Sequence, residues 1–118
     1  MNTNSDNPKV ERRHHQRVAF NSDATLQTIG VKPIAVRTRN ISVGGLSVLT
    51  SQEIAPDTRC KIHVAIPDGG SDAIPVELVA RVVSCNYNKI EGGFMLGCEF
   101  INLTANAAAT IARFMHSR

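Results

Sequence analysis

The 118-residue chain is poor in aromatic residues: it has no tryptophan, one tyrosine and four phenylalanines. Proteins that bind long single-stranded nucleic acids stack the bases on aromatic side chains, so no long nucleic acid is expected as a partner. The three cysteines, Cys60, Cys85 and Cys98, are odd in number and form no Cys-x-x-Cys pair. A disulfide framework is therefore not expected, and the pattern is typical of a reducing cytoplasm.

Long hydrophobic runs are also missing. The apolar stretches are far shorter than the roughly 18 residues that a membrane-spanning helix needs, and residues 1–8 are polar, so no secretory signal sequence is predicted there. We expect no membrane insertion and a cytoplasmic location. With 42% apolar residues, the chain has enough material for one folded domain.

Positive charge is concentrated in the first third of the chain. Residues 9–39 contain seven Lys and Arg against two acidic residues, a net charge of +5, whereas residues 40–118 carry a net charge of −1. A surface built from the first third is therefore expected to bind an anion. Because aromatic residues are scarce, a small anionic ligand is favoured.

Most of the chain alternates apolar and polar residues with the period of a half-buried strand. Short strands are predicted at residues 24–29, 34–39, 46–49, 59–66, 74–82 and 94–100, with turns at 40–45 and 67–71. Residues 105–118 change to helical spacing, with Thr104 as the N-cap and Ile111, Ala112, Phe114 and Met115 grouped on one face. We expect this short helix to close one end of the sheet.

This order of elements predicts an all-β fold, a small six-stranded antiparallel β-barrel with a C-terminal α-helix. Residues 1–10 are expected to be a disordered N-terminal lead, and residues 11–118 a single domain. Side chains fill a barrel of this size, so ligand chemistry is expected on the outer face or on loops.

Two polar motifs could bind the anion. Arg13 and Arg17 are four residues apart and therefore lie on the same face of a helix or a strand, so both guanidinium groups can converge on one compact ligand. A guanidinium binds phosphate bidentately and also matches the O6 and N7 edge of guanine. In Asn40-x-Ser42-x-x-Gly45, the amide and hydroxyl could face outward toward a base or ribose. Each motif alone also has a simpler interpretation: a solvated basic segment for the first and a strand-joining turn for the second.

Together, the two motifs resemble the PilZ domain family. The matching residues are Arg12, Arg13, Arg17, Asn40, Ser42 and Gly45, and Gly97-Cys98-Glu99-Phe100 resembles the end of the family's last strand. The resemblance covers residues 11–115. It implies a six-stranded barrel with a C-terminal helix and the binding of cyclic di-GMP, a bacterial second messenger.

The resemblance also implies roles for these residues. Arg13 and Arg17 would bind the phosphates and guanine edges, while Asn40 and Ser42 would hydrogen-bond a guanine. Asp is commoner in the family at position 40, and Asn offers only its carbonyl as an acceptor. In the family, a basic residue at the position of Arg12 is found more often with two intercalated ligand molecules per chain than with one.

Arg81 is outward-facing on its predicted strand and is a further candidate to stack on a base. The resemblance suggests a switch in which the ligand draws a mobile N-terminal segment onto the barrel wall. A downstream protein, not identified by the sequence, would then recognise the new surface, and this chain would act as the adaptor.

The sequence also bears on other classes of function. No catalytic motif is visible, and the histidines and cysteines lack metal-ligand spacing, so we expect neither an enzyme, nor a cofactor, nor a bound metal. Two alternatives stay open: a nucleic-acid-binding small β-barrel, and a PilZ-like protein adaptor that does not bind the nucleotide.

Overall fold

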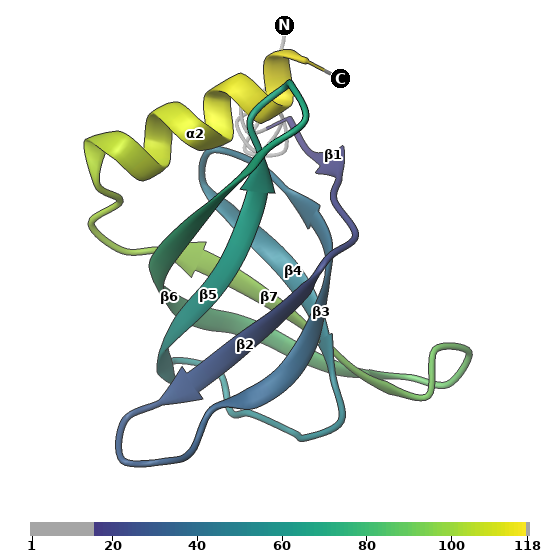
Figure 1. Cartoon of the computed structure of the whole chain (residues 1–118). Coiled ribbons are helices and arrows are strands. Elements are labelled where there is room, and N and C mark those ends of the chain that lie inside the picture. The colour runs from purple at the N-terminus through teal and green to yellow at the C-terminus, as the bar shows by residue number, and fades with distance from the viewer. Residues whose placement is uncertain (1–15, 118) are drawn as a thin grey trace, which may run out of the picture.

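The computed structural model describes residues 16–117 (Figure 1). The elements are β1 (Val18–Ala19), β2 (Asp23–Thr28), β3 (Ile34–Ile41), β4 (Gly45–Thr50), β5 (Arg59–Pro67), β6 (Ala73–Asn88), β7 (Gly93–Phe100) and α2 (Ala105–His116). Strands β3, β2, β5, β6, β7 and β4 pair in that order, and β3 also pairs with β4, which closes the barrel. The predicted all-β fold is confirmed, with the short β1 as an addition. The predicted disordered lead lies outside the described residues.

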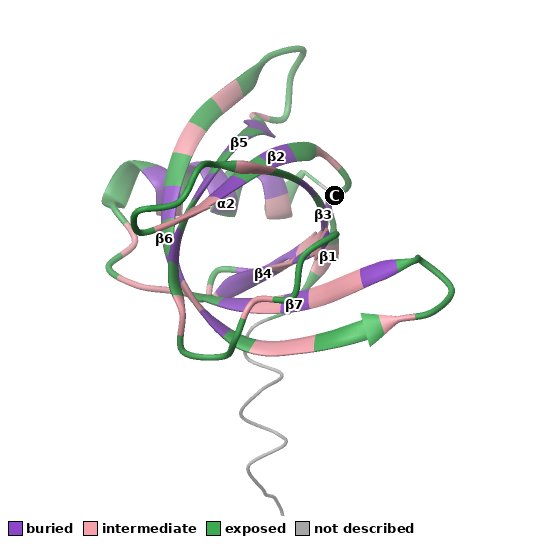
Figure 2. Ribbon diagram, turned by 90° about the horizontal axis from the view of Figure 1, so that it is seen from below, coloured by how far each residue is buried: buried purple, intermediate pink, exposed green. Residues whose placement is uncertain are grey.

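The interior of the barrel is filled with aliphatic side chains. Along β5 the burial alternates at every residue, with Cys60, Ile62, Val64 and Ile66 inside, as the sequence predicts. Figure 2 looks down the barrel and shows this banding of buried and exposed residues in the surrounding strands. Because Leu46, Ile62 and Leu96 are completely buried in this core, a ligand has to bind on the outer wall or on loops.

Helix α2 covers one end of the barrel, as expected (Figure 1). Thr104 is its N-cap, and its hydroxyl accepts a hydrogen bond from the backbone N–H of Ala107 at 3.1 Å. Ile111 and Phe114 are buried, but the prediction that Ala112 joins them is wrong: Ala112 is exposed, and Thr110 is buried in the same turn. The helix ends at His116, two residues before the predicted end.

A β-bulge interrupts the pairing of β3 with β4. Thr38 lies opposite Val48 and Asn40 lies opposite Ser47, so the register shifts at Arg39. Thr38 and Ile41 are completely buried, whereas the two residues between them are only partly buried. Since an extra residue in one strand breaks the alternation, Arg39 and Asn40 both face the outside of the barrel.

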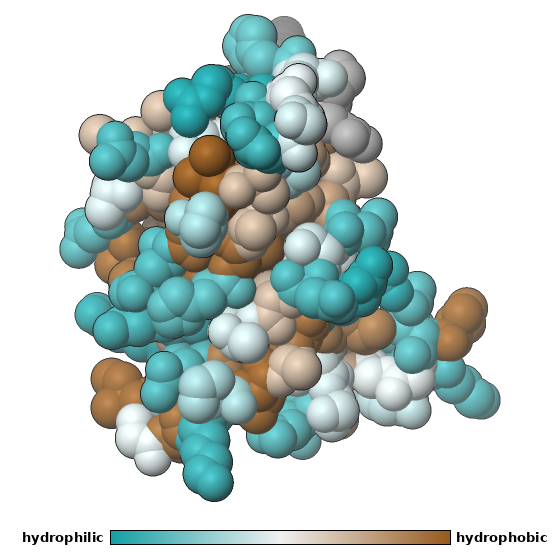
Figure 3. Space-filling view, in the orientation of Figure 1, coloured by the Kyte–Doolittle hydropathy of each residue, from teal (hydrophilic) through white to brown (hydrophobic). Residues whose placement is uncertain are grey.

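The β6–β7 hairpin projects away from the barrel. Strand β5 accompanies β6 only as far as Arg81, whereas β6 and β7 stay paired out to Asn88 and Gly93, and the projecting end is visible in Figures 1 and 2. At its tip Ile90 is 97% exposed, and the hydrophobic colour at this tip stands out among hydrophilic neighbours in Figure 3. Within residues 16–117, no helix is both long and apolar enough to span a membrane.

Candidate functional site

The chain that precedes β2 is fixed along the edge of β3, beside the bulge. Val18 and Ala19 of β1 lie opposite Ile41 and Asn40, and the backbone N–H of Phe20 donates to the carbonyl of Arg39 at 2.9 Å. Strand β1 is not predicted from the sequence, because two residues are too few to show an alternation of apolar and polar side chains. Its effect is to place the end of the basic run against the residue that begins the second motif.

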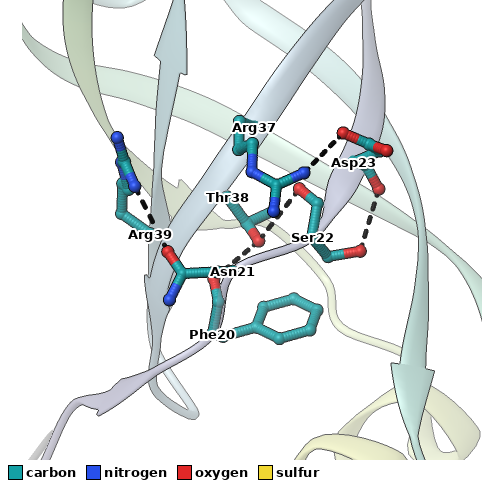
Figure 4. A network of polar contacts seen from close by, with 7 residues as sticks. All are labelled: Phe20, Asn21, Ser22, Asp23, Arg37, Thr38 and Arg39. Carbon is teal, nitrogen blue, oxygen red and sulfur yellow. Dashed lines mark hydrogen bonds and ion pairs between the residues drawn. The ribbon is translucent and has the colours of Figure 1, made fainter. Parts of the chain in front are cut away.

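Thr38 holds this segment from inside the barrel (Figure 4). Its hydroxyl donates to the carbonyl of Phe20 at 2.6 Å, and its backbone N–H donates to the carbonyl of Ser22 at 2.8 Å. The Phe20 ring lies 5.1 Å from that of Phe114 in helix α2, in an edge-to-face arrangement. The segment is therefore anchored both to β3 and to the helix that closes the barrel.

Arg17 and Asn40 are in direct contact. The guanidinium Nη1 of Arg17 donates to the Oδ1 of Asn40 at 2.7 Å, across 23 residues of sequence. Arg17 is exposed and Asn40 is partly buried, so the pair lies on the outer wall and is accessible. The other two predicted arginines, Arg12 and Arg13, lie outside the described residues.

Ser42 and Gly45 form the bend between β3 and β4. The Ser42 hydroxyl accepts from the backbone N–H of Gly44 at 3.1 Å, and the Ser42 N–H donates to the Gly45 carbonyl at 2.8 Å. The expectation that this hydroxyl faces outward is wrong, because Ser42 is only 1% exposed. A Cβ at Gly45 would lie 2.0 Å from the carbonyl oxygen of Cys98 in β7. Gly45 thus permits the close approach of two strands.

Arg81 lies apart from this group. It faces outward on β6, and three strand steps (β3 to β4, β4 to β7, β7 to β6) separate it from Asn40, roughly 14 Å at about 4.8 Å per step. Its guanidinium is hydrogen-bonded to Glu99 at 2.7 Å and to Asp57 at 2.6 Å. These two carboxylates raise the pKa of Arg81 above its ordinary value. The structure does not bring Arg81 together with Arg17.

Two further residues belong to the surroundings of Asn40 and were missed in the sequence. Ser47 lies directly opposite Asn40, and its Oγ is buried with no hydrogen-bond partner among the residues that the structure describes. It could have been found, because Leu46 and Val48 face inward and Ser47 must then face outward. Alternation along residues 34–39 already places Arg39 outward, but it would turn Asn40 inward, so the bulge that leaves both residues outward could not be predicted.

The arrangement presents the guanidinium of Arg17 and the amide of Asn40 on one part of the outer wall. Guanidinium groups there can bind phosphate or the edge of a guanine, and an amide can both donate to and accept from a base edge. Residues 16–117 contain no group of three or more His, Cys, Asp or Glu residues that could hold a metal ion. Guanidinium and amide groups are suited to the non-covalent recognition of an anion.

A family model described as the PilZ domain matches residues 11–117, which confirms the resemblance seen in the sequence. No curated protein matches the chain.

Several solved structures share the fold. The inhibitor of motility MotI (DgrA) of Bacillus subtilis has a TM-score of 0.76 and 17% identity, and the match covers 90% of this chain but 49% of MotI. The PilZ domain of Escherichia coli YcgR with c-di-GMP gives a TM-score of 0.70 and 16% identity, with 90% of both chains covered. The MrkH–c-di-GMP complex of K. pneumonia gives 0.69 and 14% identity, with 89% of this chain and 50% of MrkH covered. The chain thus spans about half the length of MotI and MrkH.

Proposed function

The chain belongs to the PilZ domain family, and on this premise we propose that it is a receptor for cyclic di-GMP. The E. coli and K. pneumonia structures of the same fold were solved with that dinucleotide, which supports the proposal. Cyclic di-GMP carries two phosphates and two guanines, so it presents both kinds of group that arginine side chains recognise bidentately.

The observation that carries the proposal is the contact of Arg17 with Asn40. The two motifs are separated by 23 residues, yet they meet at a hydrogen bond of 2.7 Å on the outer wall. The pairing of β1 with β3 brings the two motifs together on the accessible wall, which supports a joint binding site. We assign Arg13 and Arg17 to the phosphates and guanine edges and Asn40 to a guanine.

Ser42 and Gly45 act mainly through the backbone in this proposal. Because the Ser42 hydroxyl is committed to the bend, it fixes the position of Asn40 and orients the backbone of the turn toward the ligand. A bound dinucleotide would draw the basic run ahead of Gln16 against the barrel. A downstream protein would recognise this new surface, so in this proposal the chain acts as an adaptor and not as an enzyme.

Calorimetric titration with cyclic di-GMP tests the proposal. We expect micromolar affinity, about −8 kcal/mol, for the wild-type chain and no measurable binding for Arg13→Ala and Arg17→Ala. Arg59→Ala is the matched control, because Arg59 is also exposed but lies on β5. Circular dichroism should show the same barrel in all four proteins.

Two results would overturn the proposal. One is unchanged affinity in both Arg13→Ala and Arg17→Ala. The other is the behaviour of a general polyanion binder: single-stranded RNA would bind as well as the dinucleotide, and both would weaken steeply as salt rises. A ligand that prefers guanine and saturates at a fixed stoichiometry supports the receptor.

A further inference from the structure

Arg39 is placed to take part in the same site. Arg39 faces outward after the buried Thr38, and the bulge keeps Asn40 on the same side beside it. The Nη1 of Arg39 donates to the Oδ1 of Asn21 at 3.3 Å (Figure 4). Its Nη2 forms an ion pair with Glu91 in the turn of the projecting hairpin. The Nε atom is buried and has no hydrogen-bond partner among the described residues.

The guanidinium of Arg39 is therefore where three separate segments meet: the chain before β2, the bulge of β3 and the β6–β7 hairpin. The interactions of this guanidinium with Asn21 and Glu91 are of only moderate strength. The bond to Asn21 is long, and the ion pair is partly solvated, with side-chain exposures of 29% for Arg39 and 38% for Glu91. Ion pairs of this kind stabilise little, whereas phosphate can accept two parallel hydrogen bonds from one guanidinium.

We propose that Arg39 is a further ligand-binding residue and that Glu91 competes with the ligand phosphate for it. The inference rests on the proposed function, because it places the phosphate next to Arg17 and Asn40. When the phosphate binds the Arg39 guanidinium, the ion pair between Arg39 and Glu91 breaks, and the tip of the hairpin loses this contact with β3. The released tip carries Ile90, which is 97% exposed, and the hairpin also carries Tyr87, which is 61% exposed. Ligand binding would thus change an apolar surface that a partner protein can read.

Arg37 supplies a matched comparison on the same strand. It also faces outward and forms an ion pair, with Asp23 at 2.7 Å. Asp23 lies directly opposite it on β2, so this pair does not involve the hairpin or the segment before β2. Replacing Arg37 removes the same charge two residues away and separates a specific role of Arg39 from general electrostatic attraction.

The test is calorimetry with cyclic di-GMP on four full-length proteins at one salt concentration. Glu91→Gln removes the carboxylate that competes with the phosphate for Arg39 and should tighten binding about threefold. Arg39→Gln removes a charge-assisted hydrogen bond and should weaken binding at least about tenfold. Arg37→Gln should stay within about twofold of the wild type.

The hairpin itself can be followed independently, because Tyr87 is the only tyrosine in the chain. Labelling with 3-fluorotyrosine then gives one ¹⁹F resonance, which should shift when the ligand saturates the wild type. In free Glu91→Gln it should already lie part of the way toward the bound position. The same resonance, recorded in Arg39→Gln, also reports whether Tyr87 keeps its edge-to-face contact with Phe94.

The outcomes separate the two proposals. If the wild type does not bind cyclic di-GMP, the proposed function fails and this inference fails with it. If the wild type binds but Glu91→Gln binds no more tightly, or Arg39→Gln and Arg37→Gln weaken binding equally, only the inference is overturned. A ¹⁹F resonance that stays in place at saturation would overturn the release of the hairpin.

Discussion

Replacing Thr38 with valine tests how the segment before β2 is held against the barrel. Thr38 is completely buried, and valine has nearly the same shape, so the substitution removes the hydroxyl and leaves the packing nearly unchanged. The lost hydrogen bond, 2.6 Å to the Phe20 carbonyl, leaves a buried acceptor without this donor. A buried polar group that loses its partner costs about 1–3 kcal/mol. We expect Thr38→Val to lower the free energy of unfolding by that amount, or Tm by roughly 4–8 °C for each kcal/mol.

Urea denaturation followed by circular dichroism measures this loss, and Thr25→Val is the matched control. Thr25 is exposed on β2, so the same substitution there should change stability by less than about 0.5 kcal/mol. Amide hydrogen exchange at Phe20, whose N–H donates to Arg39, should be faster in Thr38→Val. Equal stability and equal exchange in the two variants would refute the anchoring role of Thr38.

Two other predictions concern the interior of the barrel. Gly45→Ala should destabilise the fold by at least about 2 kcal/mol in thermal unfolding, because its Cβ would lie 2.0 Å from the Cys98 carbonyl oxygen. The control Gly70→Ala lies on an exposed loop and should leave stability nearly unchanged. Similar Tm values for the two variants would contradict the close approach at Gly45. Cys60 and Cys98 should resist a thiol reagent in the native protein at pH 7 to 9, because both are buried, and the contact with Cys60 together with burial raises the pKa of Cys98. The half-buried Cys85 should react first, and three equal rates would show that the core is open.

Most of the barrel could be predicted from the sequence because its strands are regular. The alternation along β5 (Cys60, Ile62, Val64, Ile66) is uninterrupted, and the end of β7 at Phe100 follows the same rule. The N-cap at Thr104 could be predicted from local chemistry alone. These features depend on residues that are close together in the sequence, so they can be predicted from the sequence alone.

The details of the site depend on contacts between distant segments. Asn40 was expected in a turn but lies in β3, because the bulge against β4 carries the strand through it. Ser42 was expected to face outward, but the bend buries its hydroxyl against Gly44 and Gly45. The part played by Arg39 depends on Glu91, 52 residues away. None of these follows from periodicity, since each is set by the register between strands.

The central claim is that the basic run and the bend at Asn40 form one binding site. A heteronuclear NMR titration of the full chain with cyclic di-GMP tests it most directly, because each backbone amide reports its own response. We predict that the amides of residues 11–17 and of residues 40–45 shift together and yield one dissociation constant, while those of β5 far from the site stay in place. Shifts in only one of the two stretches, or two different dissociation constants, would contradict it.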